Sequence, residues 1–338
     1  MRTTQRSPSV QTARIRPVAA FLLTAYCLLL TASCAYAPLR SSAPQPLPLP
    51  AELAAYYDYP RAPTDVTVRL VKAGSRVRES VVQFPLLASG FEPTEPIVEF
   101  EWFESMEPGR HPAILFNPIL GGDYPLERGF CRFFALHGFQ VALVHRKTLK
   151  ISPEHPIERV ELLLRQGMLR IRQVVDWMAA QERVDPQRMG SFGISMGGIA
   201  TVMAAAVEPR LRCHVVALAG GSIPEILITS KDRLLTKPRA LYLARNHMNL
   251  ETLEARLRQS VRTDPILLAP YVDARKLLLF IALADRTIGR ANALRLRRAL
   301  GHPPMVFLPA GHYTAYLFIP YLKRASLRFF QEHLGEAR

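Results

Sequence analysis

The chain has 338 residues, of which 49% are hydrophobic and 21% are charged, and this balance excludes an intrinsically disordered chain. The only long apolar stretch lies at the extreme N-terminus, which excludes a polytopic membrane protein. The net charge is +15, of which four arginines in residues 1–34 contribute +4, and the remaining +11 predicts attraction to anionic membrane surfaces or acidic substrates. We expect no nucleic-acid partner, because the sequence has no run of five basic residues and no zinc or RRM signature.

Residues 1–34 have the order of an export signal. Arginines without any acidic residue occupy 2–16, an apolar segment follows at 18–30, and small residues come after it. A helix of that apolar length spans only about 20 Å, which is too short for a comfortable bilayer crossing. This order predicts a signal peptide and an exported bacterial protein.

Two cleavage sites compete at the end of this signal. The stretch Leu30–Cys34 resembles a bacterial lipobox, which predicts a lipid on Cys34 and a lipoprotein of the cell envelope, tethered to the membrane and facing the periplasm. The stretch Ala35–Ala37 instead fits the A-x-A site of ordinary signal peptidase, which predicts a soluble periplasmic or secreted protein. An uncleaved anchor is the third alternative.

The segment at 35–62 is predicted to be a tether. It holds five prolines between residues 38 and 50, and closely spaced prolines favour extended polyproline geometry. We therefore expect this segment to stay unpacked and to be followed by one catalytic domain at 63–338.

Beyond residue 63 the sequence alternates between apolar strands and helices. The predicted strands lie at 65–71, 79–86, 97–103, 113–119, 140–145, 188–193, 214–219, 277–283 and 305–308. The predicted helices lie at 125–137 and 157–182, after Ser195, near Arg290 and at 316–334. Antiparallel strands followed by repeated strand–helix units are typical of an α/β fold with helices on both faces of a sheet. The mostly helical stretch 223–275 interrupts this alternation, and we expect it to form a cap over the site.

The motif that indicates chemistry is Gly193-Ile194-Ser195-Met196-Gly197, a G-x-S-x-G between a predicted strand and a predicted helix. A serine on such a turn has a strained backbone, and the glycines on either side leave room for the sharp bend. The turn exposes the serine hydroxyl to a substrate. Because a hydroxyl is a poor nucleophile near neutral pH, it needs a base, and the base needs an orienting acid.

With this motif and the surrounding alternation, residues 65–335 resemble the α/β-hydrolase superfamily, and most closely its bacterial esterases and dienelactone-hydrolase-like members. The dienelactone hydrolases use a cysteine where this chain has Ser195. The resemblance implies an α/β-hydrolase fold with a mostly parallel central sheet. It also implies a triad in the order serine, acid, histidine, which points to His312 as the base and Asp285 as the acid. Glu225 is the alternative acid, since some members carry it on an earlier strand.

Two backbone N–H groups are expected to stabilise the oxyanion. One belongs to Met196, directly after the nucleophile. The other belongs to Ile119 or Leu120, in the loop after the strand at 113–119, where Gly121-Gly122 allow a close approach to the substrate. The family's His-Gly pair is absent from this loop, but a backbone donor needs no particular side chain.

The sequence predicts no metal, no cofactor and no disulfide framework. It lacks H-E-x-x-H, paired C-x-x-C and the phosphate-binding P-loop motif. Cys131 and Cys213 both lie in apolar surroundings, so we expect buried thiols, with a single bridge as the alternative.

The predicted function is hydrolysis of a small carboxylic ester or thioester through an acyl-enzyme on Ser195. Two alternatives remain at this point. The chain is a serine peptidase or amidase of the same fold, or it is a non-catalytic envelope lipoprotein that uses the fold as a binding module.

Overall fold

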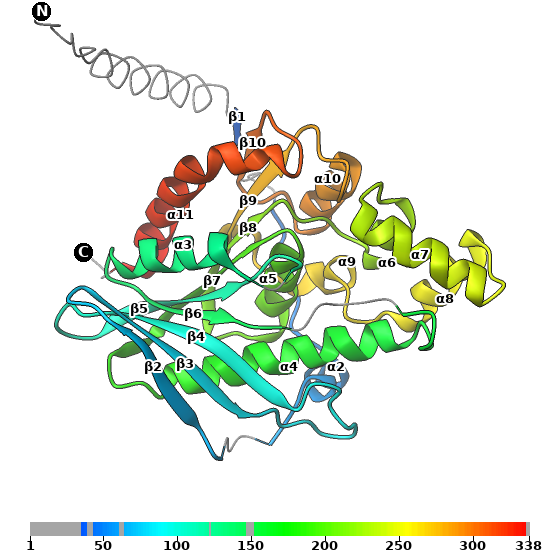
Figure 1. Cartoon of the computed structure of the whole chain (residues 1–338). Coiled ribbons are helices and arrows are strands. Elements are labelled where there is room, and N and C mark those ends of the chain that lie inside the picture. The colour runs from blue at the N-terminus through cyan, green and yellow to red at the C-terminus, as the bar shows by residue number, and fades with distance from the viewer. Residues whose placement is uncertain (1–34, 39–42, 61–63, 122, 147–151, 336–338) are drawn as a thin grey trace, which may run out of the picture.

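The computed structural model describes residues 35–38, 43–60, 64–121, 123–146 and 152–335. The predicted signal peptide, with Cys34, lies outside these residues. Within them, a single ten-stranded sheet runs in the order β1-β10-β9-β8-β7-β5-β6-β4-β3-β2 (Figure 1). The strands are β1 Ala35–Ala37, β2 Thr67–Ala73, β3 Val77–Pro85, β4 Ile97–Ser105, β5 His111–Asn117, β6 Gln140–Val144, β7 Val184–Ile194, β8 Leu211–Ala217, β9 Leu277–Ala282 and β10 Met305–Leu308.

The centre of the sheet is parallel, as predicted. Strands β6, β5, β7, β8, β9 and β10 pair in parallel, whereas β2, β3 and β4 form an antiparallel extension. Parallel strands end at one edge of a sheet, so the loops that follow β5, β7, β9 and β10 meet there. The fold is that of an α/β-hydrolase, and this edge is where its site is built.

Helices cover both faces of the sheet. They are α2 Ala51–Tyr56, α3 Pro125–Ala135, α4 Arg159–Ala179, α5 Met196–Val207, α6 Ile223–Thr229, α7 Arg233–Arg245, α8 Leu250–Ser260, α9 Pro265–Leu268, α10 Arg290–Ala299 and α11 Ile319–Leu334. On one face α3 and α11 pack on an aromatic core in which the ring centroids of Phe134 and Phe330 are 5.7 Å apart. On the other face α4, α5 and α10 cover the alternate side chains of the same strands. Because both faces are covered, the central parts of the parallel strands are mostly apolar and buried.

The C-terminal helix begins later than predicted. Instead of one helix at 316–334, a 3₁₀ turn at Thr314–Phe318 leads into α11 at Ile319. Pro320 lies in the first turn of α11, where its missing N–H has no helical partner to lose. The proline therefore sets the start of the helix.

The proline-rich segment does not behave as the unpacked tether that we predicted. Tyr57 and Tyr59 are buried, and their hydroxyls bond Thr263 Oγ1 at 3.0 Å and Asp176 Oδ2 at 2.6 Å. The Leu47 N–H donates to the Pro270 carbonyl at 2.9 Å, and α2 lies against α4 (Figure 1). Burial of these aromatic rings outweighs the preference of the prolines for a free extended chain. The described part of this segment therefore packs against the folded body.

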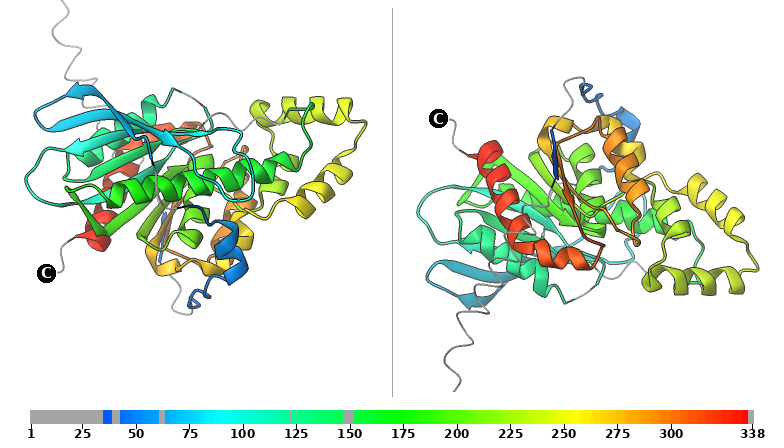
Figure 2. Two further views of the ribbon diagram at one scale, coloured as in Figure 1. Left: turned by 90° about the horizontal axis from the view of Figure 1, so that it is seen from below. Right: turned by 90° about the horizontal axis from the view of Figure 1, so that it is seen from above.

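The interruption at 223–275 is helical, and it extends sideways from the molecule. Figure 2 shows α7 and α8 projecting beyond the end of α4. Two contacts join them to the start of that helix: Arg256 pairs with Glu158 at 2.7 Å, and Asn246 Nδ2 donates to the Pro153 carbonyl at 3.3 Å. Leu234 and Leu241 of α7 are more than half exposed.

Cys131 and Cys213 are buried free thiols, as expected, and burial raises the pKa of both well above that of an exposed thiol. In the part of the chain that the structure describes, no helix is both long and apolar enough to cross a membrane.

A buried histidine in β8 predicts that stability falls in mild acid. The ring of His214 bonds Ser191 Oγ at 2.8 Å, and burial lowers its pKa from 6.5 to about 3. Between pH 6.5 and pH 3, His214 is protonated in the unfolded chain but not in the folded chain. Stability is therefore lost as pH falls from 6.5 towards 3. Between pH 7 and pH 5 this group should remove about 2 kcal/mol from the free energy of unfolding.

Urea unfolding at the two pH values checks this expectation. His214→Gln should lose that part of the pH dependence, whereas Ser191→Ala, which keeps the histidine, should retain it. Equal pH dependence in the wild type and in His214→Gln would show that this histidine does not control acid stability.

Candidate active site

The turn at Ser195 has the strain that the sequence predicts. Ser195 joins β7 to α5 with φ 57° and ψ −120°, a conformation that an L-residue rarely adopts. A Cβ on Gly197 would lie 2.0 Å from the Asn117 carbonyl oxygen, and a Cβ on Gly193 would lie 2.1 Å from the Gly197 carbonyl oxygen. Both glycines are therefore required by close packing of the turn.

The structure brings Ser195, His312 and Asp285 together. Ser195 Oγ lies 3.0 Å from His312 Nε2, and His312 Nδ1 lies 2.7 Å from Asp285 Oδ2. His312 follows β10, and Asp285 follows β9. Asp285 is 8% exposed, and its other oxygen accepts the N–H groups of Thr287 at 2.8 Å and Ile288 at 2.9 Å. This arrangement can fix the imidazole tautomer that accepts a proton from the serine.

Glu225, the alternative acid, has another partner. It lies in α6, and its Oε1 accepts from Arg295 Nη2 at 2.9 Å. The imidazole of His312 is bound by Asp285 instead. Of the two acids considered, only Asp285 has the geometry required to orient the histidine.

Of the two amides considered for the loop after β5, the structure eliminates Ile119. Its N–H donates to Glu127 Oε1 at 3.0 Å, so it is not available to a substrate. Within the described residues no acceptor contacts the Leu120 N–H. Met196 is the first residue of α5, and the N–H groups of a first helical turn have no acceptor within the helix. Of the three amides considered for the oxyanion, those of Met196 and Leu120 are therefore the two that no described residue occupies.

Two groups that sequence analysis missed hold this loop. Glu127, fully buried in α3, binds the Ile119 N–H from one side. Arg146, just after β6, donates its Nη2 to the carbonyl oxygens of Pro118 at 2.8 Å and Ile119 at 2.7 Å. Neither residue belongs to a recognisable motif, because the contacts depend on tertiary structure.

A third missed residue, Asp232, connects the cap to the histidine loop. Asp232 caps α7, and its Oδ2 accepts hydrogen bonds from Tyr313 and, at 3.0 Å, from Thr287. Burial opposes its ionisation, but the hydrogen bond from Tyr313 and those from the Leu234 amide and Thr287 outweigh burial and hold the pKa of Asp232 below its usual range. The ionised carboxylate thereby fastens the start of α7 beside His312.

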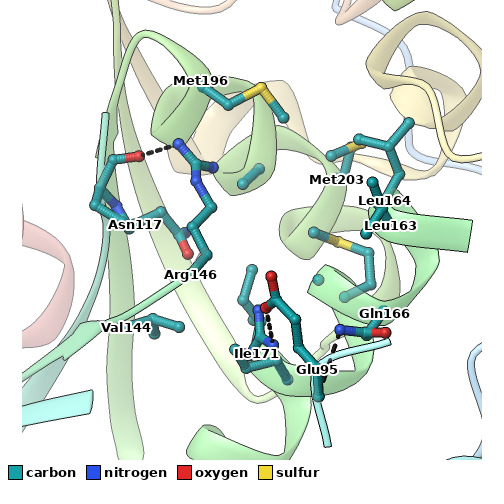
Figure 3. A pocket seen from close by; sticks show the side chains of 15 residues that line it. Glu95, Asn117, Val144, Arg146, Leu163, Leu164, Gln166, Ile171, Met196 and Met203 are labelled. Carbon is teal, nitrogen blue, oxygen red and sulfur yellow. Dashed lines mark hydrogen bonds and ion pairs between the residues drawn. The ribbon is translucent and has the colours of Figure 1, made fainter. Parts of the chain in front are cut away.

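A pocket opens beside the Ser195–Met196 turn (Figure 3). It is lined by α4 and α5, by the ends of β5 and β6, and by Glu95. None of its lining residues comes from 223–275, so the helical insertion does not form a wall of this pocket. No group of three His, Cys, Asp or Glu side chains suited to a metal ion occurs among the residues that the structure describes.

Comparison with solved structures identifies the same fold in several hydrolases. The chain is similar to acetyl xylan esterase 1 from Thermoanaerobacterium sp. JW/SL YS485, with a TM-score of 0.59 and 17% identity over 81% of this chain and 95% of that one. It is also similar to an acetyl xylan esterase from Paenibacillus sp. R4, with a TM-score of 0.60 and 15% identity over 97% of both chains. An acylaminoacyl peptidase from Pyrococcus horikoshii aligns with a TM-score of 0.55 and 14% identity over 80% of this chain and 51% of that one.

The chain therefore has the fold of the α/β-hydrolases, with a serine, a histidine and an aspartate in hydrogen-bond contact at the edge of its sheet. More narrowly, residues 170–337, just under half of the chain, match the model of the prolyl oligopeptidase family. This match includes Ser195, Asp285 and His312.

The curated relatives do not indicate an activity for this chain. Two uncharacterized proteins from strains of Mycobacterium tuberculosis are each 25% identical over 148 residues, which is 44% of this chain. The aligned part spans a third of the length of those relatives.

Proposed function

We propose that the protein hydrolyses carboxylic esters through an acyl-enzyme on Ser195. The observation that supports this most directly is the hydrogen-bonded chain from Ser195 Oγ through the His312 ring to Asp285. A buried carboxylate, a histidine in contact with it and a half-buried, strained serine form the arrangement that activates a hydroxyl. The solved esterases of the same fold favour an ester over a peptide as the substrate.

The reaction proceeds in two halves. His312 Nε2 takes the proton of Ser195 Oγ as that oxygen bonds to the carbonyl carbon, and the N–H groups of Met196 and Leu120 stabilise the resulting oxyanion. The tetrahedral intermediate collapses, the ester C–O bond breaks, and the alcohol leaves with the proton from His312. Water then attacks the acyl-enzyme, giving its proton to His312, and the acid leaves as the proton returns to Ser195.

We propose further that this activity is located in the bacterial cell envelope. The support is the signal-like order of residues 1–34 and the lipobox-like stretch that ends at Cys34. A peptidase of the same fold is the second candidate function, favoured by the prolyl oligopeptidase match. Both bond classes pass through the same intermediate at Ser195, so the first experiment addresses the serine.

A fluorophosphonate probe tests the proposal on the full chain. We expect one labelled residue, Ser195, when peptides are mapped by mass spectrometry. His312→Ala should abolish labelling, because the serine loses its base. His137→Ala removes an exposed histidine that bonds only its own helix at the Phe133 carbonyl and should label normally. A folded protein that resists the probe would instead support a non-catalytic binding module.

A further inference from the structure

The pocket of Figure 3 has an unusual polarity for an ester-binding site. Most of its wall is apolar, with side chains such as Leu164, Ile171 and Met203, but two arginines and one carboxylate also line it. These are Arg146, Arg170 and Glu95. Two guanidinium groups and one carboxylate leave a formal charge of +1 inside a largely apolar wall.

Arg170 forms an ion pair with Glu95, the one carboxylate that lines the pocket. Its Nη2 donates to Glu95 Oε2 at 2.6 Å, and the arginine is 4% exposed. Arg146 has no such partner, because among the described residues its side chain bonds only the two carbonyl oxygens of the loop after β5. Glu127 does not line the pocket. Its Oε1 accepts the Ile119 N–H, its Oε2 has no hydrogen-bond partner among the described residues, and its charge acts on Arg146 without a direct ion pair. Arg146 is therefore the cation of this pocket that forms no direct ion pair with a carboxylate among the described residues.

The surroundings of Arg146 leave it poorly solvated. Burial lowers its pKa to about 10, so the side chain is still charged at neutral pH. The Nε atoms of both Arg146 and Arg170 are shielded from solvent and have no hydrogen-bond partner among the described residues. Unsatisfied buried donors are costly, and an anion that enters the pocket would relieve that cost.

The place of the pocket in the sheet indicates which part of a substrate enters it. His312 follows β10, on one side of β7, and Arg146 follows β6, on the other side. The alcohol leaves with a proton from His312, so it lies on the β10 side, and the acyl group that stays on Ser195 extends towards β6. Strands β7 and β6 are two strand spacings apart, about 10 Å, and the arginine side chain covers part of that distance. A short acyl chain spans the remainder.

We propose that Arg146 binds a carboxylate at the far end of the substrate's acyl group, so that the protein prefers half-esters of short dicarboxylic acids. This inference rests on the proposed esterase activity and names its substrate class. The apolar wall accommodates the methylene chain, and the guanidinium forms a charge-assisted hydrogen bond to the terminal carboxylate.

Monomethyl glutarate and methyl pentanoate test the proposal. Their acyl chains have the same length and differ only in the terminal group, which is a carboxylate in the first ester and a methyl group in the second. We expect a kcat/KM at least about 10-fold higher for monomethyl glutarate with the full-length wild type, measured by acid release at constant pH. Arg146→Gln should lower the ratio of the two values by about 10- to 100-fold, the effect of one charge-assisted hydrogen bond. Arg146→Lys should retain part of the preference.

The ratio is the essential readout, because Arg146 also holds the loop that carries the Leu120 N–H. Damage to that loop lowers both rates equally and leaves the ratio unchanged, and such a result would overturn the proposal. Arg212→Gln is the matched control. It removes one positive charge from an exposed arginine near the start of β8, away from the sheet edge that carries the site. The ratio of the two kcat/KM values should stay unchanged.

Failure of this inference can be distinguished from failure of the proposed function. Cleavage of methyl pentanoate without preference for the half-ester overturns the inference alone. Cleavage of neither ester by a protein that the fluorophosphonate labels at Ser195 also overturns the inference alone. Absence of both cleavage and labelling overturns the esterase proposal, and the inference with it.

Discussion

Ser195→Ala should lower kcat for ester hydrolysis by about 10⁴- to 10⁶-fold while leaving the fold intact. The hydroxyl is the atom that bonds to the substrate, and no other hydroxyl contacts His312 Nε2 in the part of the chain that the structure describes. Removing it leaves the oxyanion donors and the pocket, which account for any residual rate. Steady-state kinetics with a short methyl ester measure the change.

Ser260→Ala provides the comparison for this variant. Ser260 ends α8, and its hydroxyl bonds only main-chain carbonyl oxygens of its own helix. Its kcat should equal that of the wild type within a factor of about two. If Ser195→Ala hydrolyses the ester at a rate near wild type, Ser195 is not the nucleophile.

Gly197→Ala should destabilise the fold by more than about 4 kcal/mol. The added Cβ would lie 2.0 Å from the Asn117 carbonyl oxygen and 2.7 Å from the Pro118 carbonyl oxygen. Both contacts are with main chain, which cannot rotate away as a side chain can. The start of α5 must therefore separate from the end of β5, and the active-site turn opens. Urea unfolding measures the loss, and soluble yield should fall with it.

Gly129→Ala is the matched change at a glycine with space around it. Gly129 lies inside α3, and its added Cβ would meet only the end of the Lys323 side chain, at 3.7 Å. Alanine has the higher helix propensity, so this variant should gain up to about 1 kcal/mol. A Gly197→Ala protein as stable as Gly129→Ala would contradict the packing described for the turn.

Sequence patterns predicted the sheet well because a buried parallel strand has a strong signal. The apolar runs that became β5, β6, β8, β9 and β10 each have little polar content to confuse the assignment. The strained serine was predictable for the same local reason, because the two glycines and the serine lie within five residues. The positions of His312 and Asp285 came from the resemblance to a family, since nothing local connects residues 27 positions apart.

The rest of the site depends on contacts that no spacing reveals. Arg146, Glu127 and Asp232 lie on three different elements, and each reaches the active-site loops only in the folded chain. The prediction that the proline-rich segment stays unpacked failed for a different reason. Its composition describes the local preference of its backbone, whereas Tyr57 and Tyr59 gain more by burial than the prolines gain by staying free.

The two cleavage alternatives would leave different products, because one removes the short strand β1 and the other keeps it. Ala35–Ala37 pair antiparallel with β10, and the same three residues form the A-x-A motif. Cleavage after Ala37 would delete β1 and leave the outer edge of β10 without this partner, open to another chain. Cleavage before Cys34 would keep the edge closed. A lipid on Cys34 would then precede the strand directly, with no spacer between them, and this edge of the enzyme would rest at the membrane surface.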